Sequence, residues 1–247
     1  MTRLTVSDLS FSYPDGTEVL RGMDIVLESG ERVGLLGPNG AGKTTFALHL
    51  NGILRAASGT ISLGETELSD QTLREIRRRV GLVFQDPDDQ LFMPTVFADV
   101  AFGPTNFGFP TDQVERRVRI ALDSVGEWDL ASRAPHHLSG GERRKVAIAT
   151  VLASDSELLV LDEPTSNLDP AGRRELVALL SSLPTTQLVV SHDLPFVLEL
   201  CPRSVIMDGG RIVADGPTGE LLSNRQLLAD HRLELPFGFD PTNIASR

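Results

Sequence analysis

Residues 37–44 read GPNGAGKT, a loop with three glycines that ends in lysine and threonine. An apolar run, residues 33–36, precedes this loop, and an apolar-rich segment, residues 46–50, follows it. The sequence therefore predicts a strand, a loop and a helix in this order, the context in which such a loop binds phosphate. Glycines let successive backbone N–H groups point at one phosphate, and the N-terminal end of the helix adds positive potential. Lys43 is expected to reach the terminal phosphates of a nucleotide, and the Thr44 hydroxyl to bind Mg²⁺.

Lysine is rare in this chain, and its placement supports the same prediction. Only two of the 23 Lys and Arg residues are lysines, Lys43 and Lys145. A compact ammonium group fits between two phosphates, whereas a planar guanidinium does not fit the same loop. The alternative is a glycine-rich turn that carries a lysine by chance, which the flanking strand and helix patterns disfavour.

Length, charge and composition narrow the class of protein. A chain of 247 residues fits one large domain, here residues 1–247. A net charge of −11 and the lack of a long Lys/Arg stripe argue against nucleic acid as the main partner. The short basic clusters at 77–79 and 116–119 are interpreted as solvated helix faces. The single Cys201 rules out an internal disulfide and fits a reducing compartment. The sequence has neither an apolar signal segment nor a stretch of about 18 apolar residues.

Strand-like and helix-like segments alternate along the chain. This alternation predicts an α/β fold with a mainly parallel sheet flanked by helices, and an antiparallel β portion is expected at the N-terminus. Residues 86–137 mix Pro and Phe with polar residues and then show helical apolar spacing, and they are interpreted as an inserted helical lobe. Residues 224–247 are expected to form a short helix and an irregular tail. The expected strands are 4–11, 19–27, 32–36, 60–63, 80–84, 157–161 and 187–190, the helices 69–79, 114–125, 170–183 and 194–200, and the hairpin 205–214.

Four polar side chains stand at the ends of expected strands. Asp162 and Glu163 follow one apolar run, and Gln85 and His192 each follow another. A strand-capping carboxylate, or a surface glutamine or histidine, is the commoner explanation for any one of them alone. Because a ligand of an α/β fold binds at the carboxyl ends of its parallel strands, four such groups downstream of a phosphate loop indicate one site. Asp162 and Gln85 are expected to hold Mg²⁺, Glu163 to polarise the attacking water, and His192 to contact the γ-phosphate.

A second set of motifs lies outside the phosphate loop. Residues 138–145 read LSGGERRK, residues 166–169 read SNLD, and the single tyrosine, Tyr13, follows the first expected strand. With the motifs above, these segments resemble the ATP-binding-cassette (ABC) ATPases over essentially the whole chain, and the LSGG stretch is that family's signature. The resemblance implies that ATP lies between two subunits arranged head to tail. One subunit would supply the phosphate loop and the other the signature at a helix N-terminus, so hydrolysis would require dimerisation.

The resemblance also assigns positions to ATP and Mg²⁺, the two cofactors that it implies. Tyr13 takes the adenine-stacking position. The catalytic positions are Gln85, Glu163 and His192, and the Mg²⁺ positions are Thr44, Gln85 and Asp162. The expected ATP-binding residues are Tyr13, Gly37, Pro38, Asn39, Gly40, Ala41, Gly42, Lys43, Thr44, Thr45, Ser139, Gly140, Gly141, Glu142 and Asp169.

Position 142 departs from the commoner family pattern, which has glutamine there. Residues 139–142, SGGE, also match a helix capping box in which Glu142 reaches back to the Ser139 N–H. The segment could therefore be a helix cap and nothing more. Both roles coexist if the Ser139 hydroxyl turns to phosphate, and a carboxylate here slightly weakens the anion site.

The segment after Gln85 narrows the family further. Residues 86–96 and 99–104, DPDDQLFMPTV and DVAFGP, look like the ATPase subunit of energy-coupling-factor importers, which take up cobalt, nickel and vitamins. The resemblance implies a groove here for an integral membrane coupling protein, with carboxylates pairing with its arginines. The alternative is that the aromatic side chains pack inside the helical lobe. The residues expected to contact the partner are Asp88, Asp89, Leu91, Phe92 and Phe97.

The sequence is therefore interpreted as an ATPase subunit that lies peripherally on the cytoplasmic face of the cell membrane and drives import. The expected partners are a second copy or a related ATPase, an integral membrane coupling protein and a substrate-binding membrane protein, without nucleic acid. The cargo, cobalt, nickel or a vitamin, stays open because a separate membrane protein chooses it in this family. His136 and His137 are interpreted as a loop and not as a metal-cargo site. The alternatives are a subunit of another ABC transporter, or a non-transport ABC ATPase acting on DNA or ribosomes, which the acidic charge disfavours.

Overall fold

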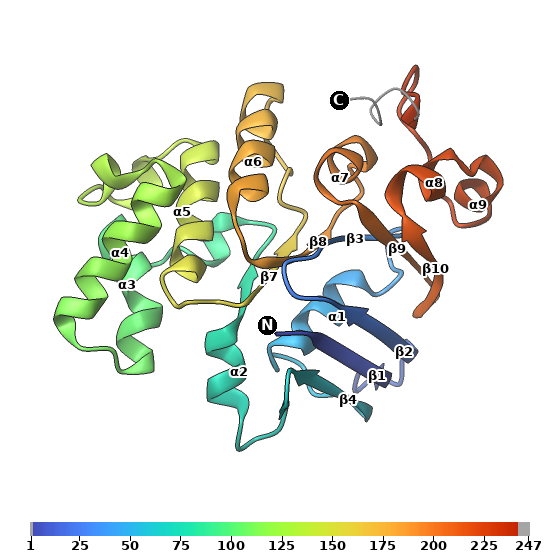
Figure 1. The fold of residues 1–247 in the computed structure, drawn as a ribbon, viewed down its shortest axis with the longest axis horizontal. Helices are drawn as coiled ribbons and strands as arrows, with labels where there is room; N and C mark the ends of the chain where they lie inside the picture. Colours follow the sequence, from blue (N-terminus) through green and yellow to red (C-terminus); the bar gives the residue numbers. More distant parts are fainter. Residues whose placement is uncertain (1, 242–247) are drawn as a thin grey trace.

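The computed structural model of the chain describes residues 2–241 (Figure 1). Residue 1 and residues 242–247, the last part of the predicted tail 224–247, lie outside this range. The strands of the described part form two sheets, with helices between and around them. Within residues 2–241, no helix is both long and apolar enough to cross a membrane.

The first sheet is antiparallel and comes from the N-terminal part of the chain, as predicted. Its strands lie in the order β2-β1-β4-β5, with β1 in the middle pairing with both β2 and β4. The strands are β1 (Leu4–Ser12), β2 (Glu18–Leu27), β4 (Ser58–Leu63) and β5 (Thr66–Glu67).

The second sheet is parallel except at one edge, which confirms the predicted mainly parallel α/β fold. Its order is β10-β9-β3-β8-β7-β6, and only β10 runs antiparallel to its neighbour. The carboxyl ends of β3, β6, β7 and β8 therefore lie along one edge of the sheet. The strands are β3 (Arg32–Leu36), β6 (Val80–Val83), β7 (Leu158–Asp162), β8 (Thr186–Val190), β9 (Arg203–Asp208) and β10 (Arg211–Pro217).

Side chains that alternate in direction along the central strands contribute to two separate hydrophobic cores, one on each face of the parallel sheet. On β7, Leu158 and Val160 pack with the antiparallel sheet and with α1 (Lys43–Leu50), whereas Leu159 and Leu161 pack with the helices of the opposite face. Successive side chains of a strand point to opposite faces, so a strand buried on both faces reads as a continuous apolar run. This explains why the sequence LLVLD is buried throughout.

The remaining helices cover the parallel sheet and extend to one side of it. α3, α4 and α5 pack against one another at the left of Figure 1. The predicted helical spacing in α4 is confirmed, because Val114, Val118, Leu122 and Val125 are all buried. α5 packs with these helices and also with β6, so the lobe boundary at residue 137 stays a prediction. The helices are α2 (Leu73–Arg79), α3 (Val96–Phe107), α4 (Thr111–Val125), α5 (Gly140–Leu152), α6 (Pro170–Ser182), α7 (Leu194–Leu200), α8 (Thr218–Ser223) and α9 (Arg225–Asp230), with short 3-10 turns at Pro87–Asp89, Trp128–Leu130 and Pro135–His137.

One prediction about local structure is wrong in its bounds, and one short turn is now defined. The helix expected over 69–79 begins only at Leu73, because the Ser69 N–H donates to the Thr72 hydroxyl over 2.9 Å and a local turn forms there instead. His136 and His137, interpreted as a loop, belong to a short 3-10 turn, and their rings lie in contact, with centroids 4.2 Å apart.

The two basic clusters are not purely solvated faces. The Arg79 side chain is only 13% exposed, and it binds Glu157 across the strand edge with Nε 2.6 Å from Oε1. The Arg117 guanidinium lies 4.0 Å from the centre of the Phe109 ring and pairs with Asp155. These arginines hold elements together, which charge spacing along the sequence could not reveal.

Candidate functional site

The glycine-rich loop takes backbone conformations that other residues disfavour. Gly37, Gly40 and Gly42 have φ values of 150°, 82° and 101°, and Gly42 caps the N-terminus of α1. A Cβ atom on Gly37 would lie 2.1 Å from the carbonyl oxygen of Met207, at the end of β9. The loop is therefore built against the β9–β10 turn, and glycine is required at this contact.

Lys43 lies at the start of α1 and is almost fully buried beneath the loop. Its Nζ donates to the carbonyl oxygens of Gly37 and Pro38 over 2.8 and 3.0 Å. Burial lowers the pKa of Lys43, and the nearby carboxylates of Glu163 and Asp162 oppose this effect. The ammonium group is thus held at the loop next to the two carboxylates that the sequence singled out.

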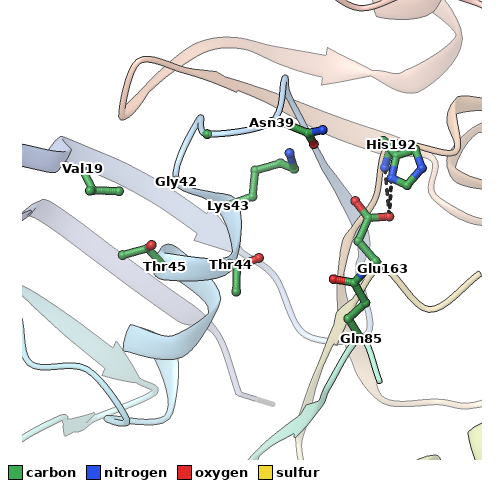
Figure 2. Close-up of a pocket in the computed structure, with 10 residues that line it drawn as sticks. Val19, Asn39, Gly42, Lys43, Thr44, Thr45, Gln85, Glu163 and His192 are labelled. Atoms are coloured by element: carbon green, nitrogen blue, oxygen red, sulfur yellow. Dashed lines mark hydrogen bonds and ion pairs between the residues drawn. The ribbon is translucent and has the colours of Figure 1, made fainter. Parts of the chain in front are cut away.

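A cleft of about 460 Å³ joins the loop to the ends of the parallel strands. In Figure 2, the side chains of Gln85 and Glu163 lie across the cleft from Lys43 and Thr44, with His192 above them. The structure therefore brings together residues that lie more than a hundred positions apart in the sequence. The lining residues are Val19, Asn39, Gly40, Gly42, Lys43, Thr44, Thr45, Gln85, Glu163 and His192.

Glu163 is held at the end of β7 by its neighbour β8. Its N–H donates to the carbonyl oxygen of Val190 over 2.8 Å, and its φ of 44° is unusual for a residue with a side chain. Its Oε2 accepts from the Ser191 hydroxyl and the His192 N–H, each over 3.3 Å, and lies 2.8 Å from His192 Nδ1. Glu163 is only 8% exposed as a whole residue. The hydrogen bonds to its Oε2 fix the direction in which its carboxylate points into the cleft.

Asp162 precedes Glu163 and carries a carboxylate oxygen without a protein partner. Its Oδ1 is buried, and within residues 2–241 no hydrogen-bond donor reaches it. Burial raises the pKa of Asp162, whereas a hydrogen bond from Thr44 lowers it. A buried carboxylate beside a hydroxyl is a donor set that suits a hard divalent cation such as Mg²⁺.

Tyr13 lies at the Thr45 side of α1 and not among the cleft-lining residues. Its hydroxyl is 3.2 Å from Thr45 Oγ1, and its ring meets that of Phe11 edge to face, with centroids 5.0 Å apart. The side chain that lines the cleft from β2 is Val19, which the sequence analysis missed because an apolar residue early in a strand carries no binding signal.

The signature segment caps α5 and lies outside the cleft. The Ser139 N–H donates to Glu142 Oε2 over 2.7 Å, and the Glu142 N–H donates to Ser139 Oγ over 3.3 Å, so the capping box is confirmed. These hydrogen bonds lower the pKa of Glu142. Ser139 and Gly141 line a separate cavity of about 120 Å³, together with Leu168 and Gly172. One copy of the chain therefore does not bring its signature to its own phosphate loop.

Asp169 serves a neighbouring helix. It is the N-cap of α6, and its Oδ1 accepts from the Gly172 N–H over 2.7 Å. It does not line the cleft described above. Its predicted contact with ATP, like that of the signature segment, stays a prediction about a larger assembly.

The predicted partner surface is only partly exposed. Phe92 is 63% exposed and meets Phe102, 44% exposed, edge to face at 4.9 Å. Leu91 is buried in the hydrophobic core, and Phe97 packs against this core. These two side chains therefore help to fill the helical lobe, which was the alternative interpretation. Asp88 pairs with Arg143 of α5, with Oδ1 3.2 Å from Nε, and is therefore already engaged within the chain.

Comparison with known proteins shows which family the chain belongs to. It matches a family model described as ABC transporter over residues 20–166. A Streptomyces avermitilis protein, provisionally named an ABC transporter ATP-binding protein, is 59% identical over 241 residues, 98% of this chain and 92% of that protein. The energy-coupling factor transporter ATP-binding protein EcfA of Methanothermobacter thermautotrophicus is 46% identical over 97% of this chain and 79% of its own length. Among solved structures, cbiO1 from Clostridium perfringens, part of the ABC transporter complex cbiONQ, has a TM-score of 0.82 at 37% identity and covers 94% of this chain and 95% of its own.

Proposed function

Because this chain belongs to the ABC transporter family and is an ATP-hydrolysing subunit, we propose that it drives an importer of the energy-coupling-factor type. The support comes from the 46% identical EcfA relative, which is matched along nearly all of this chain. The cbiO1 structure, from a complex named cbiONQ, points the same way. The proposed cargo class is a transition metal ion, cobalt or nickel, or a vitamin, chosen by a separate membrane protein.

The cleft beside the phosphate loop carries the chemical part of this proposal. In it, Lys43 holds the terminal phosphates, while Glu163 accepts a proton from the attacking water and His192 contacts the γ-phosphate. The 2.8 Å contact between His192 and Glu163 orients both groups before ATP arrives. Tyr13, whose hydroxyl contacts the cleft residue Thr45, would stack on the adenine ring.

Mg²⁺ fits the donor set at the end of β7. Thr44, Asp162 and Gln85 would hold it, and the ion would neutralise charge that develops on the β- and γ-phosphates. The unpartnered Oδ1 of Asp162 supports this assignment, because a buried carboxylate oxygen ordinarily has a partner. The low exposure of Asp162 limits solvent screening of its carboxylate, which would strengthen its attraction for Mg²⁺.

Dimerisation follows from what one chain lacks. The cleft contains the phosphate loop and the Glu163 carboxylate, whereas Ser139, Gly140 and Gly141 lie elsewhere. We infer that a second copy, or a related ATPase, places its α5 N-terminus over the γ-phosphate in a head-to-tail arrangement. Glu142 keeps its capping contact in this arrangement, which leaves the free N–H groups of Gly140 and Gly141 for phosphate.

The membrane partner would bind the exposed ring pair of Phe92 and Phe102, with Asp89 beside it. In this proposal the chain lies peripherally at the cytoplasmic face of the membrane. The alternative, a subunit of another ABC transporter, differs in partner and cargo but not in this chemistry.

Purification from the native cell tests the partner. We expect the tagged wild-type chain to co-purify in mild detergent with an integral membrane protein and a bound cargo, which mass spectrometry identifies. Phe92→Glu with Phe102→Glu places two charges in the apolar contact and should remove the membrane protein while leaving the ATPase activity of the isolated chain. Ile120→Glu is the matched control, because Ile120 is 61% exposed on α4 and lines a cavity that includes neither ring of the pair.

Two results would contradict the proposal in different ways. Undiminished co-purification of the membrane protein with the double variant would exclude the ring pair as the docking surface. A bound cargo that is neither a transition metal ion nor a vitamin would favour another class of ABC transporter.

A further inference from the structure

Arg144 is a buried arginine whose side chain binds backbone and not carboxylates. It lies in the second turn of α5 and is 3% exposed. Within residues 2–241 its Nε has no hydrogen-bond partner. Burial lowers the pKa of Arg144, with the charge of Asp86 opposing the effect. Because burying a charge costs free energy, the contacts of the Arg144 guanidinium call for a structural explanation.

The acceptors of Arg144 all belong to loops at the nucleotide cleft. Its Nη1 donates to the carbonyl oxygen of Phe84 over 2.9 Å, and its Nη2 to that of Gln85 over 2.7 Å. A longer contact, 3.4 Å, joins Nη2 to the carbonyl oxygen of Ser166. The planar fork of a guanidinium suits two adjacent carbonyl groups, and charge-assisted hydrogen bonds are stronger than neutral ones.

These loops carry two of the groups that face ATP. The side chain of Gln85 lines the cleft opposite Thr44, as Figure 2 shows. The N–H of Ser166 donates to the carbonyl oxygen of Glu163 over 3.1 Å, so the Ser166 turn is built directly on the proposed catalytic base. One guanidinium therefore holds the backbones beneath both Gln85 and Glu163.

The helix that bears Arg144 carries the signature at its N-terminus, about one turn before Arg144. Ser139 caps α5, and Arg144 lines the small cavity that Ser139 and Gly141 also line. Gln90 adds a second tie: its Nε2 donates to Ala147 O of α5 over 2.8 Å, and its Oε1 accepts from the Phe84 N–H over 3.2 Å. The signature helix and the Gln85 segment are thus fixed to each other at more than one point.

We propose that Arg144 is a positioning residue that sets the signature helix relative to Gln85 and Glu163. In this role it couples the two composite sites of a dimer, because α5 serves the nucleotide of the partner while Gln85 and Glu163 serve the chain's own. The inference rests on the proposed head-to-tail site. It adds that the alignment of the two half-sites depends on one buried cation within each chain.

The required chemistry is specific to arginine. Methionine at position 144 would leave the carbonyl groups of Phe84 and Gln85 without their donor, and the segment would shift. Lysine could reach one carbonyl oxygen but cannot span two with a rigid fork. A shift of about 1 Å in a positioning element can lower turnover by up to about a hundredfold.

Steady-state ATP hydrolysis by the purified full-length chain tests the proposal. Three variants are compared with wild type: Arg144→Met, Arg144→Lys and, as the matched control, Arg174→Met, which replaces an exposed arginine of α6. For Arg144→Met we expect kcat to fall by roughly tenfold or more with the KM for ATP little changed, since the phosphate loop is untouched. Arg144→Lys should recover part of kcat, and the control should behave as wild type.

The melting temperature and nucleotide binding separate positioning from mere stability. Fluorescent-nucleotide affinity should match wild type in every variant that folds, and Arg144→Lys should be informative if Arg144→Met does not fold. Normal kcat per folded molecule, with only a lowered melting temperature, would overturn the positioning role. A wild-type chain that hydrolyses ATP as a monomer, with no gain on dimerisation, would remove the composite site itself, and this inference with it.

Discussion

The imidazole Nδ1 of His192 lies 2.8 Å from Glu163 Oε2, and the backbone N–H of His192 points at the same oxygen over 3.3 Å. The two residues come from the ends of adjacent strands, β7 and β8. Glu163 is buried, whereas the His192 side chain is 67% exposed on the cleft side. Glu163 thus fixes the pair to the buried end of the sheet, while the His192 side chain is accessible from the cleft.

His192→Ala should therefore impair turnover and leave nucleotide binding intact. The variant loses a donor to the γ-phosphate and one contact that orients Glu163, so we expect kcat to fall by roughly a hundredfold. His137→Ala, in the 3-10 turn before α5, serves as a control. Equal turnover by wild type and His192→Ala, measured by phosphate release, would show that the histidine is only a neighbour of the carboxylate.

Two glycines of the same loop should respond differently to alanine. At Gly37 the new Cβ would lie 2.1 Å from the Met207 carbonyl oxygen, whereas at Gly40 no atom of the described chain lies within 4 Å. Gly40→Ala should cost only the strain of a positive φ, about 1–2 kcal/mol, and lower the melting temperature by a few degrees. Gly37→Ala should lower it further and abolish ATP binding, because the β9–β10 turn must move. The reverse order of effects would mean that this contact does not shape the loop.

Asp162→Asn should stabilise the nucleotide-free chain while abolishing hydrolysis. Burial raises the folded-state pKa of Asp162 above its unfolded value of 3.8, so the ionised side chain costs stability at neutral pH. This cost disappears as the pH falls through the raised pKa. We expect the variant to melt a few degrees higher at pH 7, with a smaller difference near pH 4. A lower melting temperature at pH 7 would show that Asp162 stabilises the fold.

The phosphate loop and the convergence of the strand ends could be predicted from the sequence, for physical reasons. A glycine-rich loop between an apolar strand and a helix has few alternative structures. The carboxyl ends of parallel strands share one edge, so Gln85, Glu163 and His192 meet once the sheet is recognised as parallel. The capping box at Ser139 is a local pattern and was equally accessible.

The exposure and pairing of several side chains depend on tertiary packing and could not be predicted from the sequence. The orientation of α3 packs the partly buried Phe97 against the core and exposes Phe102, and nothing in the local pattern distinguishes two phenylalanines on one helix. Asp88 was expected to face a partner but pairs with Arg143, because α5 lies beside the Pro87–Asp89 turn. In the sequence, Arg144 is simply the middle one of three consecutive basic residues, 143–145. Its helical spacing with the buried Ala147, Ile148 and Val151 is the one signal that could have marked it as buried.

The mass of the Glu163→Gln variant with and without MgATP tests the central claim most directly. Glutamine keeps the shape of Glu163 but cannot accept a proton from water, so ATP should bind without being hydrolysed and should hold two chains together. Light scattering should show a doubled mass only with MgATP. Adding Ser139→Arg, which blocks the signature, or Lys43→Ala, which removes the phosphate-facing cation, should return the mass to one chain. A variant that binds ATP but keeps the mass of one chain would contradict the composite site, as would a doubled mass that survives Ser139→Arg.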